Sequence, residues 1–80
     1  MIVAQLRLFA SAREAAGIAH DIVPGSTVDE VLSAAVSRFG TEFATVLETC
    51  RVWMNGEQVS GATPVTDRDE VAVLPPVSGG

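Results

Sequence analysis

The sequence predicts one α+β domain in which a mixed sheet is covered on one face by one main helix. Apolar strand patterns lie near the two ends of the chain, at residues 2–9 and 70–74. A strongly amphipathic helix pattern lies between them, at about residues 26–39. Asn55-Gly56 stands between two short strand patterns, which is typical of a tight hairpin. A length of 80 residues predicts a single domain.

The composition is that of a folded chain. Hydrophobic residues make up 48% of the sequence and charged residues 19%, unlike the composition of a disordered segment. The net charge of −5 argues against nucleic acid or an anionic membrane as a partner, since those surfaces bind cationic side chains. The single cysteine, Cys50, rules out an internal disulfide and is interpreted as a small core or edge residue. No signal peptide or membrane-spanning run is visible, so we expect a cytoplasmic protein.

The first quarter of the chain predicts two strands joined by a short helix. Residues 2–9 alternate, and the even-numbered positions are expected to face the core. Residues 10–17 are rich in alanine and end at Gly17, which predicts one or two helical turns with a glycine stop. A second strand is expected at about residues 18–23, before Pro24-Gly25. His20 is expected to be solvated, since no other metal-ligating residue lies at a suitable spacing.

The main helix is expected to begin at Ser26 or Thr27 and to end at Gly40. Two capping boxes are possible, Ser26 with Asp29 or Thr27 with Glu30. The two acidic residues are interpreted as partners of the helix dipole and not as a catalytic pair. The apolar stripe of this helix consists of Val28, Val31, Leu32, Ala35, Val36 and Phe39.

The second half of the chain predicts a short helix and three strands. The helical segment lies around residues 43–47, the hairpin strands at 51–54 and 57–59, and the last strand at 70–74 after a loop. We expect the first and last strands to be a central parallel pair. This order is the β-grasp, or ubiquitin-like, arrangement. The predicted core residues are Leu6, Leu8, Val28, Leu32, Val36, Val52, Met54, Val71 and Val73.

The chain divides into a β-grasp domain, residues 1–74, and a flexible tail, residues 75–80. The tail reads Pro75-Pro76-Val77-Ser78-Gly79-Gly80. Two prolines stiffen its root, and two glycines let its tip enter a narrow space. Six residues span roughly 20 Å. Although chain ends are often small and polar in any protein, this geometry suits a carboxylate used as a chemical handle in the active site of another protein.

In this context the chain resembles the small subunit of molybdopterin synthase, a ubiquitin-like sulfur carrier. The resemblance extends over the whole length. The segments that carry it are Val3 to Phe9, Ala-Ser-Ala-Arg-Glu-Ala-Ala-Gly at 10–17, the capped helix with Arg38-Phe39-Gly40, Met54-Asn55-Gly56-Glu57, Asp69-Glu70-Val71 and the tail. The tail in that context is the most specific of these segments.

The resemblance implies a mechanism centred on Gly80, with Gly79 beside it. An E1-like activating enzyme adenylates the Gly80 carboxylate with ATP, a sulfur donor displaces AMP, and Gly80 becomes a thiocarboxylate. Its sulfur then goes to cyclic pyranopterin monophosphate to form the molybdopterin dithiolene. The chain is expected to bind no cofactor and to act as a non-catalytic sulfur-donor subunit. Its implied partners are the large synthase subunit, in a heterotetramer, the activating enzyme and the sulfur donor.

A partner surface is expected on the sheet face that points away from the main helix. If Val52 and Met54 face the core, then Trp53 faces outward, and strand alternation adds an arginine-rimmed apolar patch around it. A loop of the same domain is the alternative cover for such side chains. The predicted partner-binding residues are Phe9, Trp53, Leu74, Arg7, Arg51, Pro75, Pro76, Val77 and Ser78.

Three other functions remain open at the level of sequence. The first is a sulfur carrier for thiamine thiazole or cysteine synthesis, which uses the same tail chemistry. The second is a non-covalent β-grasp interaction module whose Gly-Gly is incidental. The third, a stand-alone enzyme, is disfavoured because the sequence has no Walker-type phosphate loop, no lysine and no His/Cys/Ser cluster.

Overall fold

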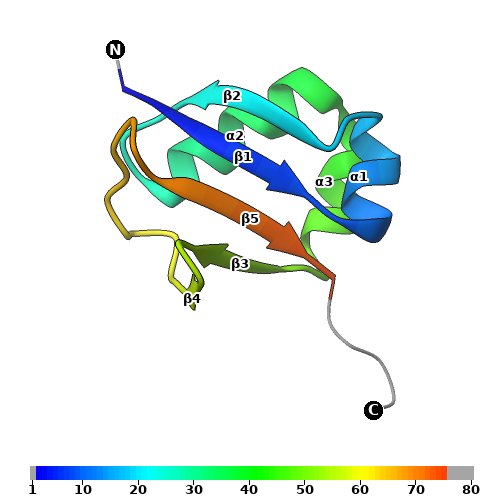
Figure 1. Cartoon of the computed structure of the whole chain (residues 1–80). Helices are drawn as coiled ribbons and strands as arrows, with labels where there is room; N and C mark the ends of the chain where they lie inside the picture. The colour runs from blue at the N-terminus through cyan, green and yellow to red at the C-terminus, as the bar shows by residue number, and fades with distance from the viewer. Residues whose placement is uncertain (1, 76–80) are drawn as a thin grey trace.

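A computed structural model describes residues 2–75, which form a five-stranded sheet with helices on one of its faces (Figure 1). The strands are β1 (Val3–Leu8), β2 (His20–Pro24), β3 (Arg51–Met54), β4 (Glu57–Gln58) and β5 (Glu70–Leu74). The helices are α1 (Ala10–Ala16), α2 (Val28–Phe39) and α3 (Thr41–Leu47). Among the described residues, no helix has the length and apolarity needed to cross a membrane.

The strand order across the sheet is β2-β1-β5-β3-β4. The central strands β1 and β5 run parallel, whereas β1–β2, β3–β5 and β3–β4 are antiparallel pairs. The predicted β-grasp fold, with the first and last strands at the centre, is therefore confirmed. Asn55 and Gly56 connect β3 to β4 with φ angles of 53° and 89°, as a type I′ turn requires.

Helix α2 begins at Thr27, and the predicted Thr27–Glu30 capping box forms in part, because the Glu30 side chain bonds to Ser26 in place of the Thr27 N–H. Thr27 is the N-cap, and its hydroxyl Oγ1 accepts a hydrogen bond from the Glu30 backbone N–H at 3.2 Å. Glu30 Oε1 accepts from the backbone N–H and the hydroxyl of Ser26, at 2.9 and 2.8 Å. These bonds lower the pKa of the Glu30 carboxyl. At the other end, Gly40 is the C-cap, as predicted.

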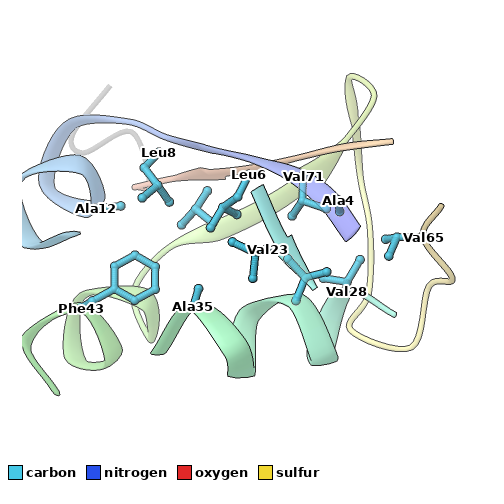
Figure 2. Packing of buried hydrophobic residues seen from close by; sticks show 12 residues of the cluster. Ala4, Leu6, Leu8, Ala12, Val23, Val28, Ala35, Phe43, Val65 and Val71 are labelled. Carbon is cyan, nitrogen blue, oxygen red and sulfur yellow. The ribbon is translucent and has the colours of Figure 1, made fainter. Parts of the chain in front are cut away.

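The core lies between the sheet and the helices (Figure 2). Phe43 of α3 is its largest fully buried side chain, and its ring meets Phe39 edge-to-face at a centroid distance of 5.2 Å. The buried hydrophobic residues are Ala4, Leu6, Leu8, Ala12, Val23, Val28, Val31, Ala35, Phe43, Val65, Val71 and Val73.

Four of the nine predicted core residues are only partly buried: Leu32, Val36, Val52 and Met54. The physical reason is the position of α2, which contacts β2 and β1 and turns Val28, Val31 and Ala35 inward. Leu32 and Val36 therefore lie on the flank of that helix. Val52 and Met54 face the core side of β3, farther from α2, and are covered less completely.

Strand β2 differs from its predicted bounds because it begins at His20 and includes Pro24. Ile18, expected at its start, is 41% exposed and lies outside the strand. Proline is compatible with the end of β2 because β2 is an edge strand, so an outward-facing residue needs no ladder donor. The return strand of the hairpin ends at Gln58, one residue earlier than predicted.

Candidate functional site

The predicted tail leaves the sheet at the end where the two central strands finish (Figure 1). Strand β5 ends at Leu74, which lies opposite Arg51 of β3, and Pro75 follows directly. The root of the tail is thus fixed by the two neighbours of β5. Residues 76–80 lie outside the described part of the chain. The roles assigned to Pro76, Val77, Ser78, Gly79 and Gly80 therefore stay predictions.

The sheet face opposite the helices carries the five folded residues that the sequence predicts for partner binding. Trp53 lies opposite Ala72, and Ala72 lies opposite Arg7, so these three share a row across β3, β5 and β1. Leu74 and Arg51 form the next row. We call this surface the open face and define it by Arg7, Phe9, Arg51, Trp53, Ala72 and Leu74.

Phe9 belongs to the open face because the β1–β5 ladder continues one residue beyond β1. Its backbone N–H donates to the Val73 carbonyl at 3.2 Å, and its φ and ψ of −128° and 149° are extended. Its side chain therefore points away from buried Leu8. Phe9 is 41% exposed, whereas Trp53 and Leu74 are partly buried. The apolar surface beside the tail root is thus present, and its most exposed side chain is Phe9 and not Trp53.

The two arginines predicted to rim the apolar patch lie on the open face, and one of them is paired with a carboxylate. Arg7 Nε pairs with Glu70 Oε2 at 2.6 Å, with both side chains largely exposed. An exposed pair of this kind contributes little to stability, but it offsets the charge of Arg7. Alternation along β5 puts Glu70 on the same face as Ala72. Strand alternation in the sequence could therefore have predicted that Glu70 shares a face with Arg7. Arg51, which is exposed, lies beside the tail root.

Cys50 and His20 have local structural contacts. The Cys50 thiol is half-buried and donates to the Val46 carbonyl at 3.3 Å, and desolvation raises its pKa. The protonated thiol is therefore favoured at neutral pH, and it is a poor nucleophile. The exposed His20 ring has Nε2 at 3.2 Å from Gln5 Oε1. Within residues 2–75, no three His, Cys, Asp or Glu side chains are grouped to hold a metal ion.

A shallow depression of about 200 Å³ lies on the helix side, between α1 and α3. It is lined by Ser11, Glu14, Ala15, Glu42 and Val46. It contains none of the predicted site residues, and its two carboxylates have no nearby cation among its lining side chains. The described residues that the sequence predicts for function lie instead at the tail root and on the open face.

Comparison with known proteins agrees with this geometry. The ThiS family model matches residues 6–80. The structure of small archaeal modifier protein 1 from Haloferax volcanii is 30% identical, with a TM-score of 0.84, and the match covers 98% of this chain and 99% of that one. No curated protein sequence matches this chain.

Two solved complexes contain chains of the same fold. One is the complex of subunits 1 and 2 of molybdopterin-converting factor from Helicobacter pylori, with 24% identity, a TM-score of 0.74, and coverage of 99% of this chain and 100% of that one. The other is the BexX/CysO complex of Amycolatopsis orientalis, with 24% identity, a TM-score of 0.78, and coverage of 96% and 99%. By its fold and by the family model, the chain belongs to the ThiS family of ubiquitin-like sulfur carriers.

Proposed function

We propose that this chain is the small subunit of molybdopterin synthase and carries sulfur as a thiocarboxylate on Gly80. The observation that carries the proposal is the match to the ThiS family model, which extends from residue 6 to Gly80 and so includes the Gly79-Gly80 end of the tail. The position of the tail root supports it, because Pro75 leaves the sheet beside Leu74 and Arg51 at the edge of the open face. A carrier needs this combination of a docking surface and a narrow reactive tip.

The chemistry proposed for the tip explains its residue types. A carboxylate is a poor electrophile until one oxygen becomes a leaving group. An E1-like activating enzyme uses ATP to form the Gly80 adenylate, releasing pyrophosphate, and a sulfur donor then displaces AMP. Side chains near this carbonyl would obstruct attack, which favours Gly79 and Gly80. The thiocarboxylate passes its sulfur to cyclic pyranopterin monophosphate, and two such transfers complete the dithiolene.

The folded domain is proposed to dock the tail and not to catalyse. A phosphorylated pterin needs cationic donors, whereas this chain has five Lys and Arg residues against ten Asp and Glu. ATP is likewise proposed to bind the activating enzyme and not this chain. The large subunit, in a heterotetramer, would then supply the cationic pocket, and the whole reaction would take place in the cytoplasm.

A second candidate has its own support. The Haloferax volcanii structure, at 30% identity, is of a protein named as a small archaeal modifier. In this case the activated Gly80 carbonyl would be passed to another protein, and the sulfur would not go to a pterin. A carrier for cysteine or thiamine thiazole synthesis uses the same first steps. All these functions share Gly80 activation and differ in the acceptor.

The first experiment tests the shared chemistry. Deleting Gly80 shortens the tail by roughly 3.5 Å, and a misplacement of about 1 Å can cost a hundredfold in rate. The truncated protein is expected to melt like the full chain and to bind the large subunit. It should form neither a thiocarboxylate, measured by intact mass after incubation with activating enzyme, ATP and sulfur donor, nor molybdopterin in a reconstituted assay.

Cys50→Ser is the matched control, since it removes the one thiol of the chain and is expected to leave sulfur transfer near normal. Product formation by the truncated protein, or its loss in a folded Cys50→Ser variant, would contradict the carrier role of the tail. The acceptor is identified separately. Loaded wild-type protein should give molybdopterin with the large subunit and cyclic pyranopterin monophosphate. Covalent adducts on other proteins, without molybdopterin, would favour the modifier function.

A further inference from the structure

Strand β2 forms one edge of the sheet, and its outer side presents backbone groups to solvent. Within residues 2–75 it pairs with β1 alone. The Leu8 N–H donates to the Ala19 carbonyl at 2.9 Å, and the Gly25 N–H donates to the Ile2 carbonyl at 3.0 Å. Hydrogen bonding alternates along an antiparallel ladder. The backbone N–H and C=O groups of residues 19, 21, 23 and 25 therefore point toward β1, and those of residues 20, 22 and 24 point away from the sheet. An open edge of this kind can pair with a strand of another molecule.

Both outward backbone groups of Ile22, the central residue of this edge, are occupied by side chains. The Ile22 N–H donates to Asp21 Oδ1 at 2.8 Å. The Ile22 carbonyl accepts from Arg38 Nη1 at 2.9 Å. The same Nη1 donates to Asp21 Oδ2 at 2.8 Å, which joins the two side chains. Pro24, the next outward residue, has no N–H to offer.

The Asp21–Arg38 ion pair contributes little to the stability of the fold, so its position on the sheet edge is its more informative property. The side chains are 28% and 43% exposed, and exposed ion pairs contribute little to stability. Arg38 lies in the last turn of α2, where a cation is favoured by the helix dipole, and it spans from the helix to the sheet edge. Its guanidinium is used on a backbone carbonyl as well as a carboxylate. The main effect of the arrangement is therefore to occupy backbone groups at the β2 edge, and its contribution to the stability of the fold is small.

We propose that Asp21 and Arg38 form an edge lock that keeps β2 from pairing with β2 of a second copy of this chain. Two antiparallel β2 strands related by a two-fold axis at Ile22 would place each Ile22 N–H against the other Ile22 carbonyl. Those are the two groups that the lock occupies. Ile22 is also 54% exposed, the largest exposed fraction among the large hydrophobic residues of the described chain, and the pairing would bury it against its copy.

The opposite edge of the sheet gives a consistent picture. Strand β4 has two residues, Glu57 and Gln58, and both are exposed and polar. Short, polar edge strands are poor templates for strand addition. With both edges protected, the open face is the part of the sheet that stays available for the docking proposed above. The edge lock thus goes beyond the proposed sulfur transfer, and it does not depend on the acceptor.

The test compares two arginines that both lie in the last turn of a helix. Arg38→Met removes the two bonds of Nη1 to β2, whereas Arg13→Met makes the same charge change in α1 and leaves both of those bonds in place. In sedimentation equilibrium at fixed ionic strength, Arg38→Met is expected to self-associate at least about tenfold more tightly than wild type and Arg13→Met. Adding Ile22→Pro to Arg38→Met should abolish this gain, since it removes the central donor of the edge.

A folded Arg38→Met variant that associates no more than Arg13→Met would overturn the edge lock. So would association of Arg38→Met that survives Ile22→Pro, because another surface would then be responsible. Amide exchange of the wild-type protein gives an answer that requires no variant to fold. The backbone N–H groups of Ile22 and His20 both point away from β1. After correction for sequence, the Ile22 amide should nevertheless exchange at least about tenfold more slowly than the His20 amide. Equal rates would show that the Ile22 N–H is not held.

Discussion

At the scale of single residues, one turn residue connects segments that are far apart in sequence. The Asn55 side chain donates from Nδ2 to Asp69 Oδ1 at 2.8 Å, and its Oδ1 accepts from the Glu70 N–H at 3.1 Å. Asp69 Oδ2 accepts in turn from the Thr66 N–H at 2.8 Å. The hairpin and the start of β5 are thus held together by polar side chains near the surface.

This network predicts an acid-sensitive contribution to stability. The bonds from Asn55 and Thr66 lower the pKa of the Asp69 carboxyl in the folded state. The unfolded chain therefore binds a proton more readily, so the contribution is present above about pH 4 and is lost as the pH falls through the folded pKa. In urea titrations between pH 7 and 2, Asp69→Asn should show a shallower loss of unfolding free energy on acidification. An acid limb as steep as that of wild type would contradict this.

Burial at single positions predicts different costs for the same substitution. Leu6 is fully buried between β1 and the helices, whereas Leu32 is partly buried on the flank of α2. Leu6→Ala should therefore cost about 2–5 kcal/mol of unfolding free energy, and Leu32→Ala less than about 2 kcal/mol. Chemical denaturation measures both. Equal costs would place Leu32 in the core, as the sequence alone predicted.

At the scale of elements, the connection from β2 to α2 depends on a close backbone approach at Gly25. A Cβ atom on Gly25 would lie 2.6 Å from the Val31 backbone nitrogen, and its φ is +153°. Gly56, in the β3–β4 turn, also has a positive φ of +89° but open space where a Cβ would be. Both positions favour glycine, but only the first is confined by another element.

Substituting these two glycines separates the two effects. Gly56→Ala should cost about 1–2 kcal/mol, the conformational penalty for a left-handed residue with a Cβ. Gly25→Ala should cost more, because the start of α2 must also shift away from β2. Thermal and chemical unfolding of the two variants provides the comparison. A Gly25→Ala protein as stable as Gly56→Ala would mean that α2 moves at no cost.

At the scale of the whole molecule, the helices occupy one face of the sheet and leave the open face next to the tail root. Trp53→Ala should weaken binding to the large synthase subunit by about 2 kcal/mol or more, as expected for a central aromatic anchor. Ile2→Ala is the control, since Ile2 is 43% exposed but precedes the opposite end of β1. Titration calorimetry on folded proteins measures both. Unchanged affinity of Trp53→Ala would exclude the open face as the docking surface.

Most of the fold followed from local signals in the sequence. Alternation predicted β1, an apolar run predicted β5, and the apolar stripe with its capping residue predicted α2. The Asn55-Gly56 turn signal predicted the hairpin of β3 and β4. The parallel central pair then followed from packing one sheet face under one main helix. The open face was predictable for the same reason, because alternation along each strand assigns every residue to one side.

The tertiary structure alone decided which apolar residues are fully enclosed and which polar residues meet. Phe43 and Val65 fill the core while Leu32 and Met54 lie at its margin, because enclosure depends on where α2 and α3 rest on the sheet. The pairs of Arg38 with Asp21 and of Arg7 with Glu70 join residues 17 and 63 positions apart. Periodicity reports the face of an element that a side chain occupies. The partner across that face is set by how separate elements pack together in three dimensions.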